Sequence, residues 1–157
     1  MGKAVIAGLA LALLCATAAK AAPFATVAFK KGESALVYDT GSVVREESNA
    51  FAWTYVILHK PLEGATLIAT YREFSCALGR TRDLSRRFAT ASGETVRAVE
   101  QPDAWQDVDL ATDRGELLRQ VCQGKPLRVV GAGLSVFALQ SVVRDALATG
   151  ATKSASR

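Results

Sequence analysis

The sequence predicts an α+β domain: an antiparallel β-sheet meander of about five or six strands, a helix packed on one face and tied by a disulfide, and a C-terminal helix. Three observations predict this class. Short apolar and β-branched runs separated by brief turns fill the chain up to about residue 105. Helical periodicity appears only after them, and two cysteines remain once an amino-terminal export signal is removed. The length of 157 residues fits one domain.

Residues 1–21 have the pattern of a secretory signal peptide. Lys3 supplies a positive start, residues 4–19 carry no charge, and Ala19 and Ala21 are the small side chains that a signal peptidase requires. An uncleaved membrane anchor is the alternative, but this run is shorter than the roughly 20 residues that cross a bilayer. We therefore predict cleavage near Ala21 and a mature protein that is periplasmic or secreted.

The cysteines predict a disulfide between Cys76 and Cys122. Cys15 lies within the signal peptide, and Leu13 and Leu14 before it argue against a lipoprotein signal, which needs a small residue there. Cys15 therefore leaves with the signal. An even pair of cysteines in an oxidising compartment is most simply a disulfide.

The strands are expected in this order: 24–29, 35–38, 51–58 with Phe51, Trp53 and Tyr55 on one side, 65–78, and a hairpin of 80–91 with 94–99. A turn at 60–64 joins the third run to the fourth. In 65–78 the apolar residues change from odd to even positions, which predicts a bulge or bend near Arg72 and Glu73. Consecutive strands with short turns favour antiparallel pairing.

Two helices follow the strands. Asp113 is a candidate N-cap with Glu116 three residues later, and the apolar residues after it share one helical face up to Cys122, before Gly124 and Pro126. A short strand is expected at 127–130 and a second helix over 134–148, ended by Gly150. Residues 151–157 are expected to be frayed. The mature chain is thus predicted to be one domain over 22–150.

The sequence offers no set of residues for known catalytic or metal chemistry. His59 is the only histidine, so the common zinc ligand sets and a catalytic dyad would depend on it alone, and no Gly-x-Ser-x-Gly turn is present. The aspartates lack EF-hand spacing, and Gly131 and Gly133 lack the third glycine of a dinucleotide turn. The aspartates in question are Asp103, Asp107, Asp109 and Asp113. We therefore expect no enzyme activity and no catalytic, cofactor-binding or metal-ligating residues.

The net charge of the mature chain does not indicate nucleic acid or an anionic membrane as a partner. Of 19 basic residues, Lys3 and Lys20 leave with the signal peptide, so 17 remain against 15 acidic ones. A net charge so near zero does not favour nucleic acid or an anionic membrane. No later run is apolar enough to span a membrane, and the mature protein is expected to be soluble.

A basic segment is the candidate partner-binding site. In an extended segment Arg80, Arg82 and Arg86 would share one side and form a positive ridge for acidic partners or glycans. Arg87 belongs to the same group. The alternative is a solvent face that Glu73 and Asp83 partly neutralise. Trp53 and Tyr55 are interpreted as core residues in preference to a ligand platform.

Several features then follow one another in a recognisable order. They are Tyr38-Asp39, Ser42-Val43 with Arg45, the aromatic run 53–58, Cys76, the basic segment 80–84, Gly93, Trp105 and the helix that closes on Val121-Cys122. Together these features, over residues 35–122, resemble the surface-adhesin protein E-like family of Gram-negative bacteria. The resemblance implies an antiparallel sheet with a helix joined to one face by a disulfide. It also implies binding to host matrix or serum proteins.

Two departures qualify what the resemblance implies. A lipidation cysteine is lacking, and an extension runs from residue 125 to 157, where it could cover a sheet edge, cover the open face or dock a second subunit. We interpret the protein as an exported, non-catalytic binding module whose partner is a host or envelope protein. The alternatives are a periplasmic enzyme inhibitor and a small exported hydrolase without a recognisable motif.

Overall fold

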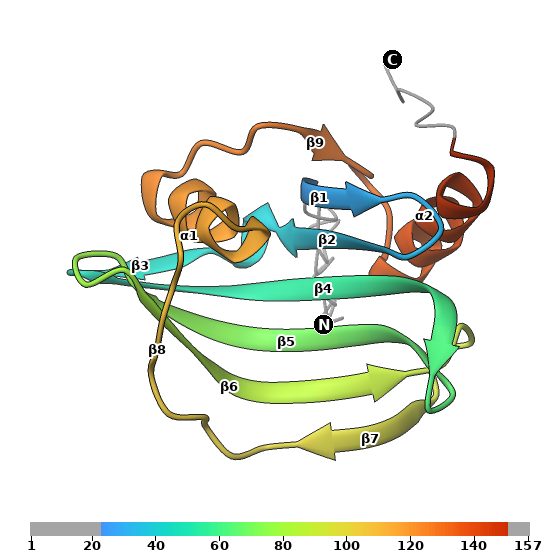
Figure 1. Ribbon diagram of the computed structural model, residues 1–157, viewed down its shortest axis with the longest axis horizontal. Coiled ribbons are helices and arrows are strands. Elements are labelled where there is room, and N and C mark those ends of the chain that lie inside the picture. The colour runs from blue at the N-terminus through green and yellow to red at the C-terminus, as the bar shows by residue number, and fades with distance from the viewer. Residues whose placement is uncertain (1–22, 151–157) are drawn as a thin grey trace, which may run out of the picture.

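The computed structural model describes residues 23–150, so the predicted signal peptide and the predicted frayed tail lie outside the described residues. The α+β class is confirmed. One antiparallel sheet has the order β7-β6-β5-β4-β2-β1-β9, with β3 beside β4 and β8 beside β6 (Figure 1). The strands are β1 Phe24–Lys30, β2 Ser34–Asp39, β3 Val44–Glu46, β4 Asn49–Leu62, β5 Ala65–Ser75, β6 Arg80–Ala89, β7 Thr95–Val99, β8 Gln106–Asp107 and β9 Val129–Val130.

The sheet has nine strands, more than the five or six expected. The additional strands β3 and β8 are three and two residues long, and segments of that length carry no measurable alternation of apolar and polar residues. The long hairpin of β4 and β5 turns at Glu63 and Gly64, whose φ angles of 50° and 83° suit a two-residue turn. Lys60 and Pro61, expected in this turn, lie instead in the last part of β4, where pairing with β5 is irregular.

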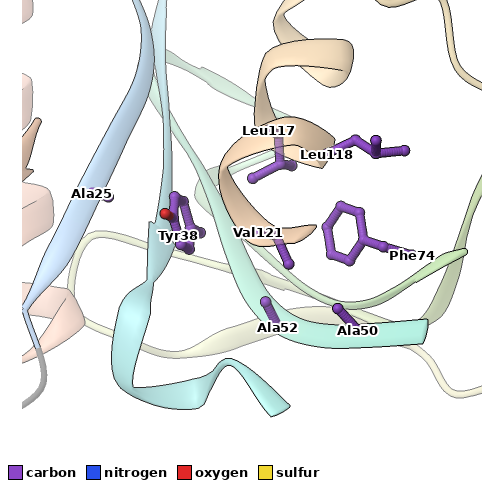
Figure 2. Close-up of a cluster of buried hydrophobic side chains, with 8 residues drawn as sticks. All are labelled: Ala25, Tyr38, Ala50, Ala52, Phe74, Leu117, Leu118 and Val121. Atoms are coloured by element: carbon purple, nitrogen blue, oxygen red, sulfur yellow. The ribbon is translucent and has the colours of Figure 1, made fainter. Parts of the chain in front are cut away.

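Helix α1, Asp113–Gln123, packs on one face of the sheet. Its cap is Thr112, one residue before the predicted Asp113, because the Thr112 hydroxyl accepts a hydrogen bond from the Gly115 amide at 3.3 Å. The helix buries Leu117, Leu118 and Val121 against the sheet, and Figure 2 shows them in one cluster with Phe74. The cluster is completed by Ala25, Tyr38, Ala50 and Ala52. The alanines of β4 leave room for the helix to approach the sheet closely.

The predicted disulfide is present. Cys76, directly after β5, and Cys122, in the last turn of α1, are joined with their Cα atoms 5.6 Å apart. Arg45 of β3 fastens the same end of the helix, since its guanidinium donates to the Val121 carbonyl at 2.6 Å. The helix is therefore held to the sheet by a covalent bond, a hydrogen bond and apolar packing.

A second apolar cluster lies on the opposite face. Successive residues of a strand point to opposite faces, so Ile57 and Val37 face away from Ala52 and Tyr38 of the first cluster. Helix α2, Val136–Thr149, covers this second cluster with Leu139. The cluster also contains Phe24, Leu67 and Ala89. Figure 1 shows α1 and α2 at opposite ends of the sheet.

The C-terminal extension both covers a face and adds to a sheet edge. Strand β9 pairs with β1 through Phe24 and Ala25, and α2 contacts β4 and β2. The helix begins at the cap residue Ser135 and ends at Gly150, which has the left-handed φ of 70° that favours glycine. Both predicted ends of this helix are thus within two residues of the observed ones.

The predicted bulge is in the right place but on the neighbouring strand. β5 pairs with β4 without interruption from Ser75 to Leu67, so β5 itself carries no bulge there. The irregularity lies in the pairing with β6, where Leu84 is the extra residue opposite Tyr71 and Arg72. The parity of β5 changes because Leu67 packs in the second cluster and Phe74 packs in the first, on the other face.

Candidate partner-binding surface

Three central strands expose one face that neither helix covers along its full length. We call it the arginine–aromatic face, and it lies opposite α1. Residues paired across antiparallel strands stand side by side, so the register sorts this face into rows. The rows are Asn49, Ser75 and Arg80, then Phe51, Glu73 and Arg82, and then Trp53, Tyr71 and Ser85. Arg87, opposite Ala69, and Trp105, above Arg82, complete it.

The four predicted arginines do not share one side. Arg80 and Arg82 pair with Ser75 and Glu73 and so belong to the arginine–aromatic face. The extra residue in β6 reverses the alternation, which turns Arg87 to this face and Arg86 to the face of α1. The expectation that Arg86 lies beside Arg80 and Arg82 was therefore wrong, because one unpaired residue moves every later residue of the strand to the other face of the sheet.

Each of the four arginines has a carboxylate partner. Arg80 contacts Asp107, Arg82 contacts Glu73 and Arg86 contacts Asp103, each with 2.6 Å between nitrogen and oxygen. Arg86 also lies 3.5 Å from Asp83, and Arg87 lies 3.6 Å from Glu100. The surface is therefore close to electrical neutrality, which agrees with the alternative of a solvent face neutralised in part by Glu73 and Asp83 and not with a positive ridge.

Glu73 organises the centre of this face. It is only 5% exposed, and its two oxygens accept from different neighbours: Oε1 from the Asn49 amide at 2.9 Å and Oε2 from Arg82 at 2.6 Å. The Arg82 guanidinium in turn lies over the Trp105 ring, 4.7 Å from its centroid. One continuous set of contacts thus fixes a primary amide, a guanidinium and an indole ring.

Aromatic side chains form a stripe beside this network. Tyr71 stacks on Phe51 with centroids 6.3 Å apart and lies 5.2 Å from Trp53. All three are partly exposed, so the interpretation of Trp53 as a core residue is correct only in part. Tyr55, further along β4, packs beside the second apolar cluster as expected. The small Ala50 and Ala52 take the buried side of β4, which is why the large aromatics face outward.

A shallow hollow of about 280 Å³ opens at the polar end of the face. It is lined by Ser48, Asn49, Ser75, Leu78, Arg80 and Trp105. Sequence reasoning found Arg80 but not the others, because the hollow combines three stretches, residues 48–49, 75–80 and 105, that are far apart in the sequence. Counting outward from the turn between β5 and β6 places Ser75 beside Arg80. The same count from Leu62 and Ala65 does not place Asn49 beside Ser75, because the register of β4 and β5 shifts between Ile57 and Leu62.

The other candidate residues occupy different positions. Asp103 and Asp107 pair with arginines, Asp113 pairs with Lys30 at 3.1 Å, and residues 23–150 hold no group of metal-ligating side chains. His59 is partly exposed and lines a second hollow, of about 230 Å³, with Ser141 and Asp145 of α2. Within the described chain no hydrogen bond joins His59 to either of them. Neither helix of residues 23–150 is long and apolar enough to cross a membrane.

Two tyrosines beside the core have raised pKa values. Burial, and secondarily the negative charge of Asp39, raise the pKa of Tyr55 to about 12. Burial also raises the pKa of Tyr38, and the positive charge of Arg45 opposes this in part. Both phenols therefore stay neutral well into the alkaline range, as their positions against the core require.

These features define a class: a disulfide-tied antiparallel α+β domain in which part of the sheet face opposite α1 is exposed. A family model described as Surface-adhesin protein E matches residues 25–123, which include β1 to β8 and α1. The chain belongs to the surface-adhesin protein E family and is an adhesin-like surface protein. The match ends before β9 and α2. Comparisons with curated proteins and with solved structures found no match.

Proposed function

We propose that this protein is an exported, non-catalytic binding module that contacts a host or envelope protein through the arginine–aromatic face. The observation that carries the proposal is the network of Asn49, Glu73, Arg82 and Trp105, which holds polar and aromatic groups in fixed positions on an open face. Binding surfaces are enriched in aromatic residues and arginine. Groups that are already ordered lose little conformational entropy when a partner binds.

Export and domain organisation form part of the proposal. Cleavage near Ala21 releases a mature chain whose residues 22–150 fold as one domain. Two findings support this. The disulfide suits an oxidising compartment, and the family is one of surface adhesins. The arginines enter as partner-binding residues in two groups: Arg80, Arg82 and Arg87 on the arginine–aromatic face, and Arg86 on the opposite face, where it pairs with Asp103.

Site-specific photocrosslinking tests which surface binds. A photoreactive amino acid replaces Leu78, which is 69% exposed at the hollow, and in a second protein it replaces Leu127, which is 76% exposed on the connection between α1 and β9. Both residues are exposed leucines outside helices and strands, so the two variants are matched. They are illuminated with a panel of purified matrix proteins and with outer-envelope proteins.

The proposal expects adducts from position 78 and none from position 127 with the same partner. Equal adducts from both positions would show nonspecific contact. Adducts from position 127 alone would move the binding surface to the connection between α1 and β9, and no adducts from either position would contradict binding to these proteins.

A further inference from the structure

The hollow beside Trp105 has the chemistry of a site for an uncharged, hydroxyl-rich ring. We infer that it binds one neutral sugar unit of a glycan. This inference rests on the proposed binding function and specifies the ligand class. Charge, hydrogen-bonding groups and size each support it.

Charge at the hollow is balanced before any ligand arrives. Arg80 is paired with Asp107 at 2.6 Å, and Arg82 beyond it is paired with Glu73 at 2.6 Å. An anionic ligand such as a sulfated sugar or an acidic peptide would have to compete with these carboxylates for the guanidinium groups. A neutral ligand can use the donors that remain without breaking an ion pair.

The groups that remain free suit hydroxyls. Arg80 donates through Nε to Asp107, which leaves its terminal nitrogens for a ligand. Asn49 donates through Nδ2 to Glu73, which leaves its Oδ1 as an acceptor. Ser48 and Ser75 add hydroxyls that donate or accept. A sugar hydroxyl is itself both donor and acceptor, so it can satisfy each of these groups.

The hollow also has an apolar surface. Trp105 is 37% exposed and Leu78 stands beside it. The negative face of an indole attracts the weakly positive C–H bonds on the apolar face of a sugar ring. The contact with Arg82 holds Trp105 in place, so the indole side chain loses little conformational entropy when a sugar ring stacks on it.

Size limits the ligand to one ring. Pockets for drug-sized molecules have volumes of about 300–1,000 Å³, and the hollow of about 280 Å³ falls just below this range. The site is also shallow, so the rest of a glycan can extend into solvent or along the aromatic stripe of Trp53 and Tyr71. The geometry fits a terminal sugar better than a free polymer chain.

A glycan array with the mature protein tests the inference. The probes are neutral, sialylated and sulfated glycans, and the variants are Trp105→Ala, Trp105→Phe and the surface control Leu127→Ala. Circular dichroism shows that each variant is folded. We expect neutral glycans to bind, Trp105→Ala to weaken binding at least about tenfold, and Trp105→Phe to restore most of it, because a ring is still present. Leu127→Ala and added salt should change little, since no ion pair forms with the ligand.

Three results would overturn the inference: no binding of neutral glycans, binding confined to charged glycans and lost in salt, or binding that Trp105→Ala leaves intact. The crosslinking experiment separates this failure from that of the proposed function. If an enzymatically deglycosylated partner protein still forms adducts at position 78, the face binds protein and the sugar inference is wrong. If neither glycans nor proteins contact position 78, both proposals fail.

Discussion

Gly115 illustrates how a single residue sets the docking of α1. A Cβ atom added there would lie 2.5 Å from the Cα atom of Leu110 and 2.6 Å from the Asp109 carbonyl oxygen. Both are backbone atoms and cannot rotate away. The glycine is therefore explained by close approach of the preceding loop to the helix, since its φ is not in the left-handed region.

Gly115→Ala is expected to destabilise the protein by about 1–3 kcal/mol. This is opposite in sign to the gain of about 1 kcal/mol that alanine usually brings inside a helix. Urea unfolding followed by circular dichroism measures the change. Ser141→Ala, at an exposed position of α2, is the control and should be neutral or slightly stabilising. A stabilised Gly115→Ala protein would mean that the loop over α1 yields easily.

Tyr55 gives a prediction for alkaline pH. Its folded-state pKa of about 12 lies above the value of about 10 for an unfolded tyrosine, so the unfolded chain loses this proton first. The contribution of Tyr55 to stability is therefore complete below about pH 10 and is lost as pH rises toward 12. Ultraviolet titration should show late ionisation to which Tyr55 and Tyr38 both contribute, and Tyr55→Phe should reduce that late step and flatten the alkaline fall in stability. A Tyr55 that ionises near pH 10 would contradict its burial.

At the scale of elements, the sequence predicted the long strands and both helices. It did not predict on which side of the sheet each residue lies or which residues of different strands become neighbours. Alternation over 51–58 and periodicity after residue 112 are strong local signals. The side on which Arg86 lies depends on Leu84, an unpaired residue whose position is set by the pairing of β6 with β5. The hollow was missed because its residues are ordinary locally. The register makes Asn49 and Ser75 neighbours, and the segment that leads into β8 brings Trp105 to Arg82 beside them.

The attachment of α1 can be measured by removing its covalent tie. The disulfide closes a loop with a sequence separation of 46, for which the chain-entropy model gives about 4 kcal/mol. The double variant Cys76→Ala with Cys122→Ala should lower the free energy of unfolding by about 4 kcal/mol. Reductant should lower the stability of the wild-type protein by a similar amount and leave that of the double variant unchanged. A double variant as stable as the oxidised protein would show that apolar packing and the contact from Arg45 hold the helix without the bond.

The attachment of α2 depends on apolar burial. Leu139→Ala removes a side chain that is buried in the second cluster and should cost about 2–5 kcal/mol. Val142→Ala, on the exposed side of the same helix, is the matched control and should cost much less. Thermal unfolding of both variants gives the comparison. If both variants lost the same stability, α2 would stabilise the protein through its helix propensity and not through packing against the sheet.

At the scale of the whole molecule, two apolar clusters share one sheet. Strands β1, β2 and β4 each contribute alternate residues to both, so loosening one cluster disturbs the backbone that supports the other. We expect Leu117→Ala, in the first cluster, and Leu139→Ala, in the second, each to shift one common unfolding transition. Tryptophan fluorescence and circular dichroism should then give the same midpoint for each variant. Separate midpoints would divide the chain into an α1 unit and an α2 unit.

The disulfide also determines how the chain responds to mechanical load. A pull on the two ends of the polypeptide is transmitted through the bond between Cys76 and Cys122, so the intervening loop carries no tension. At about 3.5 Å per residue, that loop withholds about 160 Å of extension. Arg80, Arg82 and Trp105 all lie within it. When the load acts on the two ends of the polypeptide, the segment that carries these residues therefore stays untensioned while the rest of the domain is stretched.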